Sequence, residues 1–344
     1  MISFVVVGRN DGYGINLHKR TAISLNCLAE LCENETDEII YVDCNTNDQD
    51  LTLTEAIGDT LTNRARRHLV TYRITGDVMR QTLRVNEVRF SDELSRNVAI
   101  RRSNPQNDWI LSINCDIVIR PIGSKSFAQV LRGLDPRFYC CARVSIPSEQ
   151  WQQLDRYKPQ ETFAFCDAII RRGFRIPPEE PEPWLRFKSA GDFQLAPRKH
   201  WIDIGGCEEA MIGRGHSDTN NSRRLSLFDK SERTPDLLDH LRVFHLEHNF
   251  PDTEHPDQNN VNDRTVWVEK ITDYRSTNRA DWGLLAYQLP AIRLSQEGQS
   301  PKEIFRAAPR RRTLLKDLVT AASARLWKHL SRVLNSADKK FRPK

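Results

Sequence analysis

Apolar runs and amphipathic segments alternate along the first 115 residues. Strands are predicted at residues 2–7, 38–43, 70–74 and 109–114, and the first of these is a continuous apolar, β-branched run of the kind found in a strand buried on both faces. Between them, apolar residues recur every three or four positions and predict helices at residues 17–33, around 54–61, and at 91–102, the last with Ser91 as its N-cap. This alternation predicts an α/β domain whose central sheet is mostly parallel and flanked by crossover helices.

The pattern is looser after residue 116. Strands are expected at residues 138–146, 191–195 and 243–247, helices at 197–204, 217–228 and 262–275, and a proline-rich acidic loop at 176–184. These elements complete one domain over residues 1–288. Residues 289–309 have the composition of a linker, which leads to a tail at residues 310–344.

The composition narrows the class of protein. The 344 residues are 39% hydrophobic and 28% charged, with no run of about 18 apolar residues, so we expect a globular fold without a membrane span. The first residues lead into a strand pattern without a basic start or a cleavage site, so we expect no signal peptide. The eight cysteines form no C-x-x-C pair, which favours free thiols in the cytoplasm.

Charge is distributed unevenly along the chain. Residues 301–344 contain 13 Lys and Arg and three acidic residues, whereas the first 300 contain 38 basic and 43 acidic residues, a balance that does not favour nucleic acid as a partner. In the tail, an apolar stripe from Leu315 to Leu334 runs beside Trp327, and basic residues occupy the remaining positions. This pattern predicts a peripheral anchor at the inner face of a membrane. Packing on the domain or on a partner is the alternative.

Polar residues follow three of the predicted strands. A glycine-containing loop at residues 8–14 follows the first strand, Asp43 ends the second, and Asp116 follows the fourth. Ligands of open parallel sheets bind beyond the carboxyl ends of the strands, so these residues predict one site. The spacing of the glycines does not fit G-x-G-x-x-G and there is no P-loop, which disfavours a dinucleotide oxidoreductase.

Six motifs in a fixed order carry a resemblance to a known family. They are the first strand with Gly8; EIIYVD; LSRNVA before WILSINCD; GDFQLAPRKHWIDIGGCEE; GRGHSD; and VFHLEH. Over residues 1–275 the chain resembles the GT-A nucleotide-sugar glycosyltransferases, especially the family-2-like enzymes and the related galactosyltransferase C-terminal region. The resemblance implies the GT-A fold. It also implies transfer of a sugar, with inversion, from a nucleotide diphosphate donor to a glycan or lipid-linked acceptor, as in polysaccharide biosynthesis.

The resemblance also implies a metal site. The D-x-D motif of the family matches Asn114-Cys115-Asp116 with its first acid replaced, so Asp116 would hold Mn²⁺ or Mg²⁺ against the donor diphosphate. His245 is the expected further ligand, and His248 is the alternative. A carboxylate that only ends a strand and a histidine that is only structural are the competing interpretations.

Donor-binding residues are implied in the same way. The residues expected at the nucleotide or the donor sugar are Gly8, Arg9, Asn10, Asp43, Arg96, Asn97, Asn114 and Asp192. Asp43 would hydrogen-bond the base or ribose, and Asp192 would contact the donor or acceptor sugar. For Arg96 and Asn97, a solvated helix face is the alternative.

Residues 213–218 resemble the W-G-W-G-G-E-D motif of the family, whose second acid is the catalytic base. Asp218 matches that acid, while Arg214 and Ser217 replace an aromatic residue and the first acid. As a base, Asp218 would take the proton of the acceptor hydroxyl. As the simpler alternative, it would stabilise a helix N-terminus. Glu208 and Glu209 are the alternative acids.

Two other classes of function are weighed against this one. A sugar nucleotidyltransferase shares the fold class but needs a glycine-rich G-x-G-T-R loop after the first strand, which GRNDGYG does not provide. A non-catalytic peripheral membrane scaffold would account for the basic tail and the altered N-C-D motif. The order of the six motifs favours the glycosyltransferase.

Overall fold

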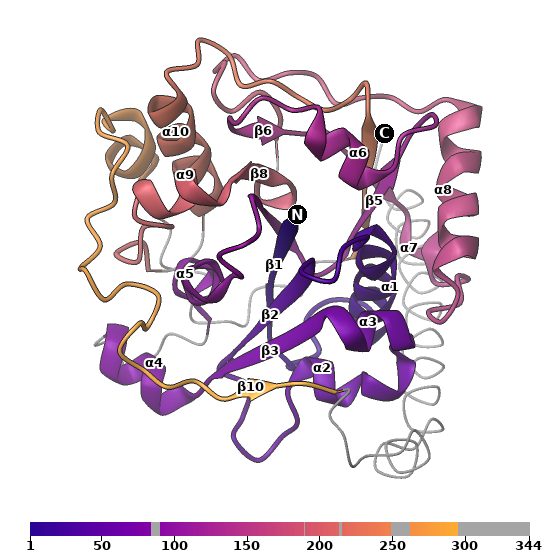
Figure 1. Ribbon diagram of the computed structural model, residues 1–344, viewed down its shortest axis with the longest axis horizontal. Coiled ribbons are helices and arrows are strands. Elements are labelled where there is room, and N and C mark those ends of the chain that lie inside the picture. The colour runs from indigo at the N-terminus through magenta and orange to yellow at the C-terminus, as the bar shows by residue number, and fades with distance from the viewer. Residues whose placement is uncertain (84–89, 189, 213–214, 249–261, 295–344) are drawn as a thin grey trace, which may run out of the picture.

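The computed structural model describes residues 1–83, 90–188, 190–212, 215–248 and 262–294. At its centre is a seven-stranded sheet with the strand order β10-β3-β2-β1-β4-β8-β6 (Figure 1). In chain order these strands are β1 (Ile2–Gly8), β2 (Glu38–Cys44), β3 (Leu69–Ile74), β4 (Trp109–Asn114), β6 (Tyr139–Cys140), β8 (Gln194–Pro197) and β10 (Ala291–Ile292). The four strands β3, β2, β1 and β4 are parallel and the other three pair antiparallel, so the predicted mostly parallel α/β class is confirmed.

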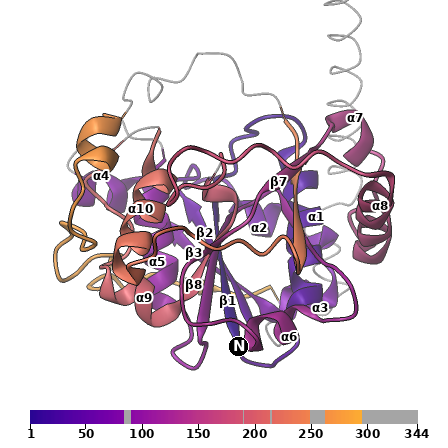
Figure 2. The same cartoon turned by 90° about the horizontal axis from the view of Figure 1, so that it is seen from above.

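Helices cover both faces of this sheet (Figure 2). One face carries α1 (Leu17–Leu31), α3 (Asn63–His68) and α6 (Phe127–Arg132); the other carries α5 (Asp92–Arg102), α9 (Arg198–Asp203) and α10 (Ser217–Asp229). Strand β1 shows why two helical layers form. Alternate side chains of a strand point to opposite faces, so Phe4 and Val6 pack with α1 while Val5 and Val7 pack with α5.

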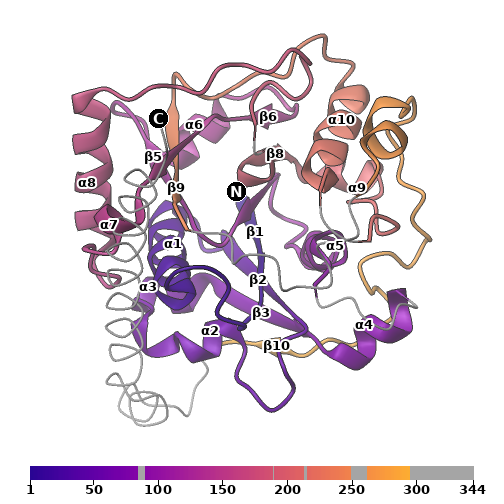
Figure 3. The same ribbon diagram turned by 180° about the vertical axis from the view of Figure 1, so that it is seen from behind.

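A second, three-stranded sheet has the order β5-β9-β7, with β5 at Ile117–Pro121, β9 at Leu241–Leu246 and β7 at Arg143–Ile146. Ile117 and Val243 on one face join the core beneath α1. Val118 and Phe244 on the other face pack with α7 (Ser148–Trp151) and α8 (Pro159–Arg172), which lie at the outer side of the molecule (Figure 3). Helix α1 therefore lies between two cores and is buried almost all round.

Short elements complete the described residues: α2 (Leu53–Ala56), α4 (Gly76–Leu83), 3₁₀ turns at Gly58–Thr60 and Ala190–Asp192, and a π-helical turn at Thr265–Glu269. In the described ranges, none of the helices combines the length and the apolar character that crossing a bilayer requires.

The elements predicted for the first half of the chain are largely confirmed. The strands β1 to β4 and the helices α1 and α5 lie where the pattern predicts them. The hydroxyl of Ser91 accepts a hydrogen bond from Leu94 N (3.2 Å) and caps α5. The helix predicted around residues 54–61 is wrong in length, because α2 ends at Ala56 and a 3₁₀ turn follows.

Three predictions in the second half need correction. The single strand expected at 138–146 is two strands, because β6 pairs with β8 in one sheet and β7 pairs with β9 in the other. The strand expected at 191–195 begins only at Gln194. The helix expected at 262–275 is reduced to the π turn, since Asp263 and Asp273 accept hydrogen bonds from backbone N–H groups two residues on, and such turns compete with a helix. Elements α3, α4, β5, α6, α7 and α8 are not predicted from the sequence.

The sheet also extends into the stretch predicted as a linker. Ala291 and Ile292 pair with Tyr72 and Thr71 at the edge of β3. The remaining linker residues after 294, the tail at 310–344 and Arg214 lie outside the described residues.

Candidate metal and donor site

The turn Cys115-Asp116 links the two sheets, because β4 belongs to the central sheet and β5 to the second one. In the second sheet, Ile117 pairs with His245 of β9. The carbonyl of Asp116 accepts a hydrogen bond from Leu246 N (3.0 Å). Asp116 is therefore held where the sheets meet, at the carboxyl end of β4, as the strand-end argument predicts.

The structure brings Asp116, His245 and His248 together. Asp116 Oδ2 lies 3.6 Å from His245 Nε2 and 3.2 Å from His248 Nε2. Within the described ranges this is the one group of three His, Cys, Asp or Glu side chains with ligand atoms all within 4.8 Å of one another. One carboxylate and two imidazoles fit a divalent transition metal such as Mn²⁺ better than Mg²⁺, which prefers oxygen ligands.

The carboxylate of Asp116 is buried and yet stays ionised. Its exposed fraction is 4%. Burial by itself would raise the pKa of Asp116, but the imidazoles of His245 and His248 and the charge of Arg20 lower this pKa far below its usual value. A carboxylate that remains charged in a buried position is suited to hold a cation.

Beside this cluster, four side chains form a hydrogen-bonded row: Arg96, Asn114, Asp192 and Arg143. Arg96 Nη2 donates to Asn114 Oδ1 (2.9 Å), and Asn114 Nδ2 donates to Asp192 Oδ1 (2.6 Å). Arg143 Nη1 donates to the other oxygen of Asp192. Asn114 accepts on one side and donates on the other, which an ionised aspartate cannot do. The side chain of Asn114 thus places the carboxylate of Asp192, from another segment, next to the end of β4.

Asp192 belongs to the same electrostatic environment as the cluster. Its exposed fraction is 1%. Burial raises the pKa of Asp192, and the positive charge of Arg143 opposes that rise. Arg96 is itself buried and donates to Asn114, so it is joined to the predicted metal motif by a hydrogen bond.

Asp218 lies against the turn that carries Asp192. Its Oδ2 accepts a hydrogen bond from Gly191 N (3.0 Å), and its Oδ1 accepts one from Thr219 N (2.8 Å). A Cβ atom added to Gly191 would lie 3.1 Å from the Cβ of Asp218, so these two segments are in contact. Asp218 is half-buried in the first turn of α10, where the helix dipole favours a negative charge.

Three other predicted residues hold the polypeptide rather than line this site. Asn97 Nδ2 donates to Cys207 O (2.9 Å) and to Glu209 Oε1 (2.8 Å), and Asn97 Oδ1 accepts from Cys207 N. Glu208 accepts two hydrogen bonds from Thr277. Asn97, Glu208 and Glu209 therefore fasten the turn after α9 to the segments around it.

The residues near β1 and β2 that are predicted to contact the nucleotide differ in their surroundings. Asp43 is fully buried; its Oδ2 accepts a hydrogen bond from Leu53 N (2.8 Å), whereas its Oδ1 has no hydrogen-bond partner among the described residues. Burial raises the pKa of Asp43. Asn10 is bonded to Thr46, Leu51 and His18. Gly8 ends β1 against Tyr41, and Arg9 lies 4.0 Å from Asp11.

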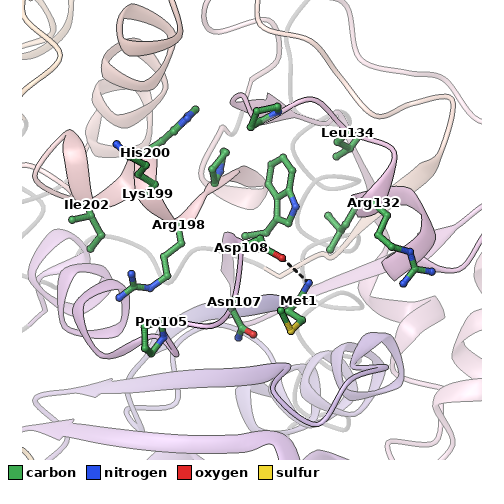
Figure 4. Close-up of a pocket in the computed structure, with 14 residues that line it drawn as sticks. Met1, Pro105, Asn107, Asp108, Arg132, Leu134, Arg198, Lys199, His200 and Ile202 are labelled. Carbon is green, nitrogen blue, oxygen red and sulfur yellow. Dashed lines mark hydrogen bonds and ion pairs between the residues drawn. The ribbon is translucent and has the colours of Figure 1, made fainter.

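A groove of about 790 Å³ lies elsewhere, beside the amino ends of β1 and β4 (Figure 4). It is lined by Met1, Trp109 and residues of α9, among others. Three of its side chains have partners within the protein: Arg198 with Ser103, Lys199 with Asp203, and His200 with Asp229. No predicted site residue lines this groove, so we assign it no part in the chemistry.

Two arginines at the site are missed by the sequence analysis. Arg20 Nε lies 3.6 Å from Asp116 Oδ2, and Arg143 donates to Asp192. The sequence does contain an indication for Arg20, because this residue lies in the same helix as Leu17, Ala22 and Leu25. A buried arginine there needs a charged or hydrogen-bonding partner. The sequence contains no such indication for Arg143, because only the pairing of β7 with β9 brings it to the site.

Comparisons with known proteins find distant similarity to solved structures. No family model matches the chain, and no curated protein is similar to it. Among solved structures, a mannosyltransferase from Pyrobaculum calidifontis in complex with GDP-Man and Mn²⁺ is 13% identical, with a TM-score of 0.41 over 74% of this chain and 58% of that one. GalNAc-T7 with UDP, GalNAc and Mn²⁺ is 13% identical, with a TM-score of 0.45 over 72% and 44%.

A third solved structure, the galactosyltransferase LgtC with donor and acceptor sugar analogues, is 12% identical, with a TM-score of 0.35 over 72% of this chain and 87% of that one. The chain thus spans about half the length of the first two structures. At these identities and TM-scores, the similarities establish neither a family nor an activity for the chain.

The hydrogen-bonded row predicts the outcome of exchanging its two central residues. Asn114→Asp alone places two carboxylates at hydrogen-bond distance, and we expect the free energy of unfolding to fall by about 2–4 kcal/mol. In the double variant Asn114→Asp/Asp192→Asn, the carboxylate at position 114 accepts from Arg96 and from the new amide, whose oxygen accepts from Arg143. We expect the double variant to recover at least about half of the loss.

Urea denaturation at pH 7 of the four proteins in this cycle measures the coupling. Asp192→Asn is the second single variant of the cycle. It places two amide side chains opposite each other. If the loss of unfolding free energy in the double variant equals the sum of the losses in the two single variants, the stability of the pair at positions 114 and 192 does not depend on which side chain donates and which accepts.

Proposed function

We propose that the chain is a metal-dependent glycosyltransferase that uses a nucleotide diphosphate sugar as donor. The observation that carries the proposal is the cluster of Asp116, His245 and His248 at the carboxyl end of β4, adjoining the Asn114–Asp192 pair. Ligands of open α/β sheets bind beyond the carboxyl ends of the strands, and here the cluster offers three donor atoms at such an end. Mn²⁺ is the proposed cation on the basis of this donor set.

The cluster would act on the leaving group of the reaction. A cation held by these three side chains supplies positive charge that stabilises the nucleoside diphosphate as it departs. Asp116 provides the anionic ligand, and the two histidines complete the protein's share of the coordination shell. Hydrogen bonds from Asn114 and Arg143 hold the carboxylate of Asp192 in place. Its proposed role is to orient the donor or acceptor sugar.

Asp218 is the proposed general base. The acceptor hydroxyl loses its proton to Asp218 as its oxygen forms a bond with the anomeric carbon, and the bond from that carbon to the phosphate oxygen breaks. Attack opposite the departing phosphate inverts the anomeric centre. The backbone N–H groups of Gly191 and Thr219 hold the carboxylate in place next to the Asp192 turn.

The first test of this function is donor binding by Asp116→Asn. We expect UDP- or GDP-sugars to raise the melting temperature of the unaltered protein in the presence of Mn²⁺, because the cation bridges donor and protein. Asp116→Asn should lose that shift. Asp229→Asn is the matched control, since Asp229 is also a buried aspartate in contact with a histidine, His200 Nδ1 at 3.0 Å. An unchanged Mn²⁺-dependent shift in Asp116→Asn would falsify the metal assignment.

The second test separates chemistry from binding at Asp218. Asp218→Asn keeps the size of the side chain and removes the base, so we expect release of nucleoside diphosphate in the presence of a glycan acceptor to slow by at least about 10²-fold. Its Mn²⁺-dependent thermal shift with donor should stay within about 1 °C of the unaltered protein. Full turnover in Asp218→Asn would show that another group takes the proton. Release of pyrophosphate instead of nucleoside diphosphate would indicate a sugar nucleotidyltransferase.

A peripheral membrane location is proposed from the sequence of residues 310–344 alone. Each Lys or Arg near an anionic surface contributes about 1 kcal/mol, so we expect the full chain to sediment with vesicles containing phosphatidylserine and to be released by salt. A chain ending at Ala308 should stay in the supernatant and keep the melting temperature of the full chain. Equal sedimentation of the two chains would contradict the anchor. Aggregation of the shorter chain would place the tail in the core.

A further inference from the structure

Arg20 brings a permanent positive charge into the proposed cation site. Its side chain is 1% exposed on α1. Two of its nitrogens donate to backbone carbonyls, Nη1 to Ile15 and Nη2 to Tyr13 (3.1 Å). The third nitrogen, Nε, lies 3.6 Å from Asp116 Oδ2 and has no hydrogen-bond partner among the described residues.

The two carboxylates nearest the proposed cation site, Asp116 and Asp192, each face an arginine. Asp116 is the only carboxylate of the cluster, and the guanidinium of Arg20 offsets it. Position 114 is an uncharged asparagine, and the nearby charge of Asp192 is offset by Arg143. A divalent cation entering this site therefore meets little net negative charge.

Arg20 repels such a cation through its electric field, without being a ligand. A metal ion ligated by Asp116 Oδ2 would lie within a few ångströms of the guanidinium. At that separation and an effective dielectric constant of about 20, charges interact strongly, and salt screens a buried pair little. A diphosphate group, by contrast, carries the negative charge that the site lacks.

We propose that Arg20 makes tight cation binding depend on the diphosphate. In the protein alone, Arg20 weakens the affinity of the Asp116 cluster for Mn²⁺; a nucleoside diphosphate restores it by supplying negative charge. The inference deepens the proposed function and rests on its cation site. Because Arg20 is buried, it acts through Asp116 and the field at the site rather than by touching the ligand.

The same guanidinium also positions the loop before α1, so its charge must be tested apart from its hydrogen bonds. A Cβ atom added to Gly14 would lie 2.7 Å from His248 Nδ1 and 3.1 Å from Arg20 Nη1. The ring of Tyr13 packs edge-on against His248, with the centroids 5.4 Å apart. Replacing Arg20 therefore disturbs the loop whatever the new side chain is, and Arg20→Lys, which keeps the charge, is the matched control for Arg20→Gln.

The test is Mn²⁺ binding in the absence of nucleotide, followed by electron paramagnetic resonance of the free ion at low salt. We expect Arg20→Gln to bind Mn²⁺ at least about 10-fold more tightly than the unaltered protein, because it removes the repulsion. Arg20→Lys should stay within about threefold of the unaltered protein. Thermal unfolding of each variant reports the loss of the loop hydrogen bonds, which should be similar in both.

A second measurement on the unaltered protein covers the case in which Arg20→Gln does not fold. Saturating UDP or GDP should tighten Mn²⁺ binding by at least about 10-fold, and Mn²⁺ should tighten nucleotide binding by the same factor. Equal Mn²⁺ affinity with and without nucleotide would overturn the proposal. So would weaker or unchanged Mn²⁺ binding by a folded Arg20→Gln.

The outcomes also separate this inference from the proposed function. Tight Mn²⁺ binding that Arg20→Gln leaves unchanged would overturn the role of Arg20 and leave the glycosyltransferase proposal standing. No Mn²⁺ binding by any of the three proteins, with or without nucleotide, would overturn both.

Discussion

The arrangement of the site depends on one buried carboxylate. Asp116 is 4% exposed, and an ionised group in such a position must be compensated by nearby positive charge or hydrogen bonds. The compensation comes from three directions: His245 on β9, His248 just after that strand, and Arg20 on α1. Because β4 and β5 lie on either side of Asp116, the same residue also fixes how the two sheets meet.

A second constraint is the direction of the hydrogen bonds in the neighbouring row. Arg96 and Arg143 can only donate, so the two residues between them must accept at both ends, and one of them must also donate. An asparagine facing an aspartate satisfies this condition. The result is a site with one carboxylate in the metal cluster and a second one, Asp192, held beside it. The altered N-C-D motif is therefore consistent with a cation site that is poor in negative charge, which is the basis for the role given to Arg20.

The sequence predicts the parallel half of the fold well, for a physical reason. Strands β1, β2 and β4 are buried on both faces and therefore appear as continuous apolar runs, and the helix capped by Ser91 carries its own start signal. The antiparallel elements depend on pairing between distant segments. No local pattern shows that residues 139–146 divide between two sheets.

The same distinction applies to the candidate site. Asp116 and the two histidines are found from motifs, whereas Arg143 reaches Asp192 only through strand pairing, and Asn97 and Asp43 make local hydrogen bonds that no motif shows.

The measurement that tests the central claim most directly is anomalous scattering at the manganese edge from crystals grown with Mn²⁺ and UDP or GDP. The account predicts one strong peak within about 2.5 Å of Asp116 and of at least one of the two histidines. A peak elsewhere on the sheet, or nucleotide bound with no peak at Asp116, would contradict it.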